Sequence, residues 1–251
     1  MIELNDRDAS AAASFAKDGF AILNDLADPE TLKELRSLYD GMLDGSVPCP
    51  GTDRELGGLT RQIMRPHLHH PKFENNAVLD RAREIAKSLM NIDDPQFVFS
   101  MLIYKPPGHP HETPWHQDLA YARMPITPVG TRLANDTIAQ FWLALDDVDE
   151  TMGCMEYIPG AQNNPMLPHH VASGDPSDDG RLLAIDEPEH HIDLSSAVKC
   201  PLKAGSATVH GYATPHYTGP NLSVRGRRAY IFSFGNPVKL EQAIRDIGTP
   251  Q

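Results

Sequence analysis

Residues 97–108 read FVFSMLIYKPPG, and this stretch separates two parts of the chain with different patterns. Its first eight residues are rich in β-branched and aromatic side chains, and the Pro-Pro-Gly at 106–108 ends the run, as is typical of a strand. Helical patterns precede it, and several short apolar runs follow it. Helices first and strands afterwards predict an α+β fold, mainly β in its second part, whose strands form a sandwich or barrel.

The part before this strand is predicted to be helical, with one strand. Helices are expected over residues 11–17, 28–45 and 77–90, and a strand over 19–23. Asp28 supplies a capping carboxylate and Pro29 stands at the first helical position, which favours a helix start there. Leucines at helical spacing follow, and Gly45 ends the segment.

The part after this strand is predicted to contain short strands joined by turns. Strands are expected over residues 97–104, 138–145, 154–158, 206–209 and 228–234. Three longer loops, 51–71, 122–135 and 165–194, are expected to set specificity, and the last is expected to lie over the barrel as a lid or binding loop. We expect one domain over residues 1–251, with a helical part at about 1–94 and a strand core at about 95–236.

Composition excludes several classes of function. The 22 Lys and Arg against 34 Asp and Glu give a net charge of −12. An acidic chain without a basic cluster is a poor candidate for binding nucleic acid or an anionic membrane. No run approaches the roughly 18 apolar residues of a membrane span. The start carries no leader pattern, and three distant cysteines indicate free thiols. We therefore expect a cytoplasmic protein of undetermined oligomeric state.

The most informative motif is His-Gln-Asp at 116–118. Residues i and i+2 of an extended segment point to the same side, so His116 and Asp118 can face one ion. A third ligand would complete a 2-His-1-carboxylate triad, which suits non-haem Fe(II). The triplet alone is a weak signal because it often occurs by chance. Two residues compete for the third position: His210, at the end of a strand, and His216, at the start of a turn.

Arg227 lies eleven residues beyond His216. If the intervening turn returns the chain as the adjacent antiparallel strand, Arg227 comes back alongside the metal. A guanidinium there would bind a carboxylate through two hydrogen bonds.

In their order and spacing, these motifs resemble the phytanoyl-CoA dioxygenase family of Fe(II)/2-oxoglutarate-dependent oxygenases. The resemblance extends from Gly19 to Phe234. It is carried by MLIYKPP at 101–107, WHQDL at 115–119, FWLAL at 141–145, GCMEYIPG at 153–160, and HYTGPN at 216–221 with Arg227. The resemblance implies a double-stranded β-helix, a jelly roll of the cupin type, with helices packed outside.

The resemblance also implies an iron site. His116 and Asp118 match the first two ligands of the family, and His216 matches the third, which leaves His210 as a neighbour of the site. The family often has Gly directly after the third ligand, where this chain has Tyr217. Related halogenases replace the acidic ligand by Gly or Ala. Because Asp118 is retained, the resemblance favours hydroxylation or another oxidation over halogenation.

The co-substrate site follows from the same resemblance. Arg227 and Thr218 match the groups that hold the distal carboxylate of 2-oxoglutarate, and Met101 and Trp142 match positions lining its pocket. Lys105 is interpreted as a solvated side chain at the end of a strand, with contact to a substrate or co-substrate carboxylate as the alternative. The histidine pairs at 69–70, 169–170 and 190–191 are likewise interpreted as solvated loop residues, because adjacent side chains point opposite ways.

The resulting prediction is an Fe(II)- and 2-oxoglutarate-dependent dioxygenase that uses O2 to hydroxylate a C–H bond of a small-molecule metabolite, releasing succinate and CO2. An acyl-CoA substrate would favour a basic surface patch, and none is visible. Desaturation, epoxidation or ring rearrangement of a natural-product intermediate are alternatives with the same cofactors. A non-enzymatic, metal-binding cupin-like protein is an alternative from another class, and it would need neither Arg227 nor Thr218.

Overall fold

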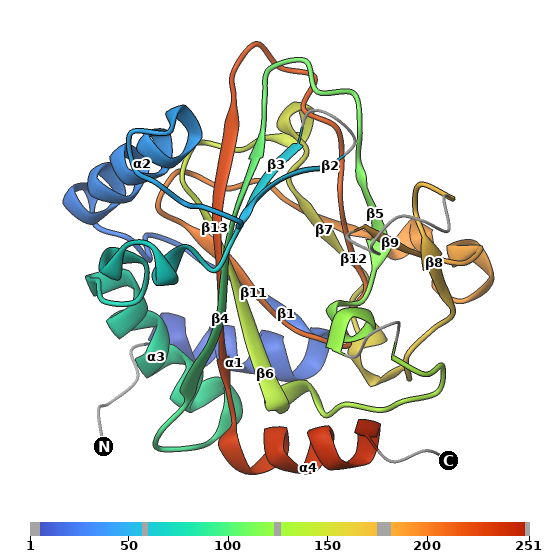
Figure 1. Cartoon of the computed structure of the whole chain (residues 1–251). Helices are drawn as coiled ribbons and strands as arrows, with labels where there is room; N and C mark the ends of the chain where they lie inside the picture. The colour runs from blue at the N-terminus through green and yellow to red at the C-terminus, as the bar shows by residue number, and fades with distance from the viewer. Residues whose placement is uncertain (1–5, 57–59, 123–126, 175–181, 249–251) are drawn as a thin grey trace.

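The computed structural model describes residues 6–56, 60–122, 127–174 and 182–248. Within these ranges the strands form two antiparallel sheets that face each other, with a separate hairpin (Figure 1). In spatial order, the larger sheet contains β1 (Phe20–Leu23), β11 (Ala207–Gly211), β6 (Ile138–Ala144), β13 (Arg227–Gly235), β4 (Gln96–Lys105), β3 (Thr60–Met64) and β2 (Asp53–Leu56). The smaller sheet contains β10 (Val198–Cys200), β7 (Met155–Tyr157), β12 (His216–Thr218) and β5 (Thr113–His116). This arrangement is the expected double-stranded β-helix.

Helices cover the outer face of the larger sheet. They are α1 (Asp6–Asp18), α2 (Pro29–Asp44) and α3 (Ala77–Met90), while α4 (Pro237–Gly248) follows the last strand (Figure 1). The Asp28 carboxylate caps α2 by accepting hydrogen bonds from the backbone N–H groups of Glu30 and Thr31, and Gly45 ends it at φ 85°. Both ends of α2 were therefore predicted correctly from the sequence. No helix in the described part of the chain is long and apolar enough to cross a membrane.

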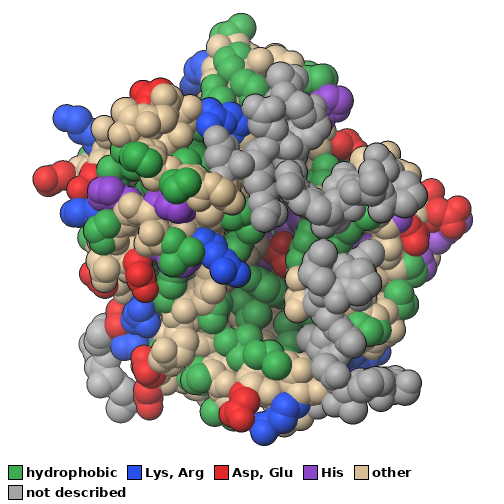
Figure 2. Space-filling view, viewed as in Figure 1, with side chains coloured by type: hydrophobic (Ala, Val, Ile, Leu, Met, Phe, Trp, Pro, Cys, Tyr) green, Lys and Arg blue, Asp and Glu red, His purple; other side chains and the backbone are tan. Residues whose placement is uncertain are grey.

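The pleat of the larger sheet separates two apolar layers. The outward side chains pack against the helices in the main core, which includes Phe15, Leu35, Leu102, Phe141 and Tyr230. The inward side chains of β4, β6 and β13 form a second cluster between the two sheets: Met101, Ile103, Trp142, Ala229 and Ile231. In the space-filling view, hydrophobic side chains form the floor of a hollow between the sheets (Figure 2).

Arg227 and Arg228 are neighbours that follow this pleat to opposite faces. Arg227 is buried. Arg228 donates to Asp146 through Nη2 at 2.7 Å and to Asp40 of α2 through Nη1 at 2.6 Å. This outer arginine therefore fastens α2 to the strand.

The path from β12 to β13 differs from the prediction. Arg227 was expected beside the metal on the condition that the turn after His216 returns the chain as the adjacent strand, but β12 pairs with β5 and β7, whereas β13 pairs with β4 and β6. The chain crosses from the smaller sheet to the larger one. The Asn221 side chain holds this crossing, because its Nδ2 donates to the carbonyls of Lys105, Pro106 and Arg225.

Two of the three predicted loops contain strands. β2 and β3 lie within 51–71, and a hairpin of β8 (His169–Val171) and β9 (Leu183–Ile185) lies within 165–194. Residues 57–59, 123–126 and 175–181 of these loops lie outside the described residues. The helix α4 was also not predicted.

Candidate functional site

The proposed ligands come together where two strands of the smaller sheet pair. His116 of β5 lies directly opposite His216 of β12, and their ring centroids are 4.1 Å apart. Asp118 begins a short 3-10 helix, η3 (Asp118–Ala122), immediately after β5. The His116 Nε2 is 3.7 Å from Asp118 Oδ1, and the His216 Nε2 is 3.7 Å from Oδ2. One potential ligand atom from each residue lies within 4.8 Å of the other two, a donor set that can hold a metal ion.

Both imidazoles are oriented for coordination through Nε2. The His116 Nδ1 is 2.8 Å from the Pro114 carbonyl, and the His216 Nδ1 is 3.0 Å from the Thr214 carbonyl. A carbonyl only accepts, so Nδ1 carries the hydrogen and Nε2 keeps its lone pair. Burial lowers the pKa of both histidines below its ordinary value, which favours the neutral form that binds metals.

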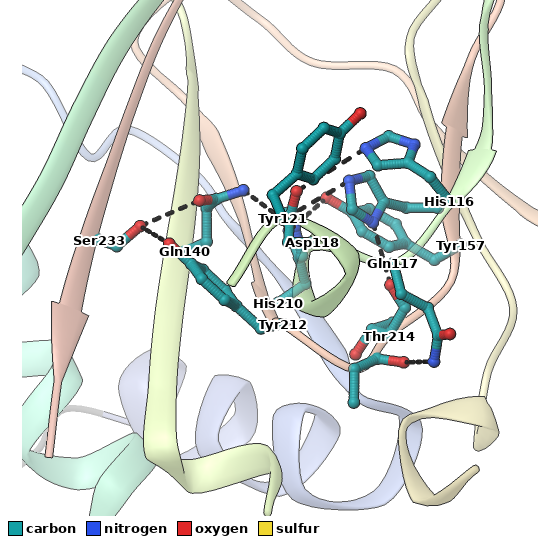
Figure 3. A network of polar contacts seen from close by, with 12 residues as sticks. His116, Gln117, Asp118, Tyr121, Gln140, Tyr157, His210, Tyr212, Thr214 and Ser233 are labelled. Atoms are coloured by element: carbon teal, nitrogen blue, oxygen red, sulfur yellow. Dashed lines mark hydrogen bonds and ion pairs between the residues drawn. The ribbon is translucent and has the colours of Figure 1, made fainter. Parts of the chain in front are cut away.

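The Oδ2 atom of Asp118 is contacted by two side chains, His210 and Gln140 (Figure 3). His210 Nε2 lies 3.1 Å from Oδ2, and Gln140 Nε2 donates to the same atom. Burial alone would raise the pKa of Asp118, but His216, His210 and His116 together hold it well below its ordinary value. The carboxylate is therefore ionised at neutral pH. No pattern in the sequence indicated a role for Gln140.

Gln117, which lies between His116 and Asp118 in the sequence, connects this part of the site to the segments around Ala213 and Leu167. Its Nε2 donates to the Ala213 carbonyl at 2.8 Å, and its Oε1 accepts from the Leu167 N–H at 2.8 Å. Its backbone N–H donates to His169 Nε2 at 3.1 Å. The interpretation of His169 as a solvated loop residue is therefore wrong, because β8 turns its ring inward, and burial lowers its pKa to about 4.

Two buried cations lie further along the same interior. Arg227 and Lys105 are cross-strand partners, 1% and 0% exposed. Arg227 donates to the Gly153 carbonyl at 2.5 Å, and its Nε is buried with no hydrogen-bond partner. Lys105 Nζ donates to Thr218 Oγ1 at 3.1 Å and to the Gly219 carbonyl at 2.8 Å. The interpretation of Lys105 as solvated is wrong, because its position in the pleat puts it beside Arg227.

These two cations have an unusual electrostatic setting. Within the described residues, neither forms an ion pair with a carboxylate. Burial lowers the pKa of Arg227 to about 10. Burial, with Arg227 second, lowers the pKa of Lys105 to about 6. Buried charge without a counter-ion is costly, so this part of the interior is suited to an anion.

Trp142 and Met101, which were also expected in the co-substrate pocket, lie in the same interior. Trp142 is 4% exposed, and the Arg227 guanidinium carbon lies 5.3 Å from its ring centroid. Met101 packs against the inner apolar cluster. Tyr217, where the sequence departs from the family pattern, points to the outer side and stacks on Trp115 with ring centroids 5.4 Å apart. The Tyr217 side chain therefore lies outside the interior that surrounds the His216 ring.

Comparison with known proteins places this geometry in context. A family model described as phytanoyl-CoA dioxygenase matches residues 15–229. EvdO2 from Micromonospora carbonacea var. aurantiaca, solved in complex with 2-oxoglutarate, is 33% identical with a TM-score of 0.74, over 92% of this chain and 90% of EvdO2. The epimerase SnoN, solved with Fe3+, alpha ketoglutarate and nogalamycin RO, is 18% identical with a TM-score of 0.68, over 91% of this chain and 83% of SnoN. SnoN shares the fold.

Curated relatives are longer. The phytanoyl-CoA dioxygenase domain-containing protein 1 of Danio rerio is 29% identical over 167 residues, which are 66% of this chain and 53% of that protein. The chain thus spans about half the length of the curated relatives it matches. With a family model matching from α1 to β13 and a fold shared with a solved protein that binds 2-oxoglutarate, this chain belongs to the phytanoyl-CoA dioxygenase family of Fe(II)- and 2-oxoglutarate-dependent oxygenases.

Proposed function

We propose that the protein hydroxylates a C–H bond of a small-molecule metabolite, with Fe(II) held by His116, Asp118 and His216 and with 2-oxoglutarate as co-substrate. The observation that carries this proposal is the pairing of a three-ligand donor set with a buried, unpaired arginine in one interior. Thr218, which contacts Lys105, lies two residues along β12 from His216, about 7 Å at the usual strand rise of roughly 3.3 Å per residue. That spacing suits a five-carbon dicarboxylate.

The donor set fits Fe(II). Two neutral imidazole nitrogens and one carboxylate oxygen make up the facial triad of non-haem iron oxygenases, and they leave positions for co-substrate and O2. When bound, iron supplies the O2 activation that converts 2-oxoglutarate into succinate and CO2 and oxidises the substrate C–H bond. The chain contributes binding, orientation and exclusion of water.

The distal carboxylate of 2-oxoglutarate is assigned to Arg227 and Thr218. The Nε–H of Arg227 has no partner. This hydrogen and a second guanidinium hydrogen can together bind the two oxygens of a carboxylate. Thr218 Oγ1 accepts a hydrogen bond from Lys105, which leaves its own hydrogen to donate to the anion. Lys105 adds a second positive charge when the bound carboxylate stabilises its protonated form. Trp142 and Met101 shield the carbon chain from water and strengthen these contacts.

Hydroxylation is preferred over halogenation because Asp118 keeps a carboxylate as the acidic ligand. A small metabolite is preferred over an acyl-CoA because the chain carries a net charge of −12. Desaturation, epoxidation or ring rearrangement need the same ligands, so analysis of the product separates them from hydroxylation.

The alternative, a non-enzymatic metal-binding protein, would not need the buried Arg227 and Lys105.

The enzyme function is tested by anaerobic addition of Fe(II) and 2-oxoglutarate, which we expect to produce a weak visible charge-transfer band. Substrate-stimulated succinate release in air is then measured. Arg227→Met should weaken 2-oxoglutarate binding at least tenfold, as expected for a lost charged hydrogen bond of about 1.5–3 kcal/mol.

The exposed Arg225 provides the matched control, because Arg225→Met removes a positive charge two residues away from the pocket residue. It should leave 2-oxoglutarate affinity unchanged. The proposed enzyme function would be wrong if the wild-type protein bound Fe(II) without showing the band and if both arginine variants had the same affinity for 2-oxoglutarate.

A further inference from the structure

His210 lies beside the proposed iron site but outside its ligand set. Its Nε2 faces Asp118 Oδ2 at 3.1 Å, and its ring centroid is 4.4 Å from that of His216. Even so, the group of mutually close ligand atoms among the described residues contains only His116, Asp118 and His216. His210 is 1% exposed. A buried histidine in this position has a role to be identified.

The partners of His210 fix where its hydrogen lies (Figure 3). Its Nδ1 is 3.0 Å from the Tyr157 hydroxyl, which is itself 2.7 Å from Thr208 Oγ1. Burial raises the pKa of Tyr157 well above its ordinary value, so the phenol keeps its hydrogen.

Only one arrangement of a neutral imidazole satisfies every partner. Thr208 donates to the Tyr157 oxygen, Tyr157 donates to His210 Nδ1, and His210 Nε2–H donates to the Asp118 carboxylate. The opposite tautomer would place the lone pair of Nε2 against the lone pairs of Oδ2, which is repulsive. Tyr157 therefore sets the tautomer of His210.

A second donor reaches the same carboxylate oxygen from the larger sheet. Gln140 Nε2 donates to Oδ2, and its own Oε1 accepts from Ser233 Oγ at 3.0 Å. Two donors on Oδ2 leave Oδ1, 3.7 Å from the His116 Nε2, as the oxygen available to a metal. Without His210 the carboxylate could rotate and offer both oxygens, which would occupy a position needed by the co-substrate or O2.

We propose that His210, held in one tautomer by Tyr157, is a positioning residue that restricts Asp118 to coordinating iron through one oxygen. The inference rests on the proposed function for the identity of the metal. It assigns to His210 and Tyr157 a role distinct from that of a ligand.

The experiment uses Co(II) as the probe, because its visible spectrum reports the number and geometry of its ligands and no turnover is needed. His210→Leu removes the donor and should raise the Kd for Co(II) about 10- to 100-fold, as outer partners of metal ligands commonly do. Its Co(II) spectrum should shift, since the carboxylate now binds through two oxygens. Tyr157→Phe changes almost no volume and should give a smaller shift in the same direction.

His210→Gln separates positioning from packing. The glutamine Nε2 reaches roughly the place of the histidine Nε2, so this variant should restore affinity and spectrum to near wild type. Tyr230→Phe is the matched control, because Tyr230 is also fully buried and its hydroxyl donates to the Phe73 carbonyl on the helix side of the sheet. It should lower thermal stability without changing Co(II) binding.

The possible results divide clearly. Wild-type Kd and spectrum in His210→Leu would overturn the inference, and so would a His210→Gln variant as defective as His210→Leu at equal thermal stability. Co(II) binding that depends on Asp118 and His210 in a protein that binds no 2-oxoglutarate would overturn the proposed function and support the positioning role. A wild-type protein that binds no Co(II) would overturn both.

Discussion

Lys105 shows how one residue can be misread without its neighbours. The sequence places it at the end of a strand before two prolines, where an exposed lysine is the usual interpretation. The structure buries it completely beside Arg227, in contact with Thr218 and the Gly219 carbonyl. The difference arises from strand alternation: Lys105 shares the inward face with Met101 and Ile103.

A substitution of Lys105 tests its share in co-substrate binding. Lys105→Met keeps the length and apolar stem but removes the charge and the donor to Thr218. We expect the Kd for 2-oxoglutarate to rise about 10- to 100-fold, corresponding to roughly 1.5–3 kcal/mol for a lost charged hydrogen bond. Isothermal titration calorimetry of the Co(II)-loaded protein measures this. The exposed Lys199→Met should bind normally; equal affinity in both variants would remove Lys105 from the pocket.

At the residue scale, the candidate ligands that the local motifs indicated are close together in the structure, and their role in binding iron stays a prediction. His116, Asp118 and His216 were selected from motif order and spacing, and the structure brings their ligand atoms together. Tyr157 and Gln140 could not be found in this way, because each looks like an ordinary strand residue. Their positions around Asp118 depend on which strands pair and in what register.

At the scale of elements, Gly153 allows two turns to meet. It stands at φ 69°, just before β7, and a Cβ there would lie 2.1 Å from the Gly219 carbonyl oxygen. Its own carbonyl accepts from Arg227. This close approach positions the arginine relative to the turn that follows Thr218.

Gly153→Ala should therefore damage both stability and binding. The left-handed conformation alone costs an L-residue roughly 1–2 kcal/mol, and the backbone clash adds to it, so urea unfolding should show a loss above about 2 kcal/mol. Gly160→Ala is the control, since Gly160 has φ 78° but nothing within 4 Å of its added Cβ. It should lose only the conformational part and keep its 2-oxoglutarate affinity. Equal losses in the two variants would show that the contact with Gly219 is unimportant.

Elements with a clear local pattern were predicted best, whatever their length: the four-residue strand β1 was predicted, whereas the twelve-residue helix α4 was missed. The ranges of α2 and α3 and of β4, β6 and β13 follow from periodicity, capping residues and β-branched runs. β5 and β12 are too short to show a pattern, yet they carry His116 and His216. The crossing between sheets after β12 depends on the Asn221 side chain and its three distant carbonyls, so no local pattern reveals it.

For the whole molecule, co-substrate binding should be linked to folding and to pH. Without a bound anion, burial lowers the pKa of Lys105 from 10.5 to about 6; Arg227 lowers this pKa further and Glu112 raises it. The nearby His109 has a pKa of about 4, so it does not titrate above pH 6. Between about pH 6 and 10.5 the unfolded chain binds more protons at Lys105 than the empty native state. The contribution of Lys105 to stability thus rises with pH in this window.

A bound carboxylate reverses the preference of Lys105, because it stabilises the protonated form. Affinity for 2-oxoglutarate should therefore fall as pH rises above about 6, and the increase in Tm at a fixed concentration should be larger at pH 6 than at pH 8. Thermal melts with and without 2-oxoglutarate, each compared with Lys105→Met, measure this. Identical pH profiles in the wild type and Lys105→Met would contradict it.

The opposed pair Arg227 and Arg228 also bears on how the chain selects its own fold. On the outer face Arg228 forms ion pairs with Asp40 and Asp146, whereas on the inner face Arg227 forms none with a carboxylate of the described residues. A slip of β13 by one residue would exchange them, leaving Asp40 and Asp146 facing the wrong side chain and every apolar neighbour inverted. Alternative registers are thus penalised from both faces at once. The two adjacent arginines therefore favour the correct register of β13, and Arg227 is the one whose charge a bound anion would neutralise.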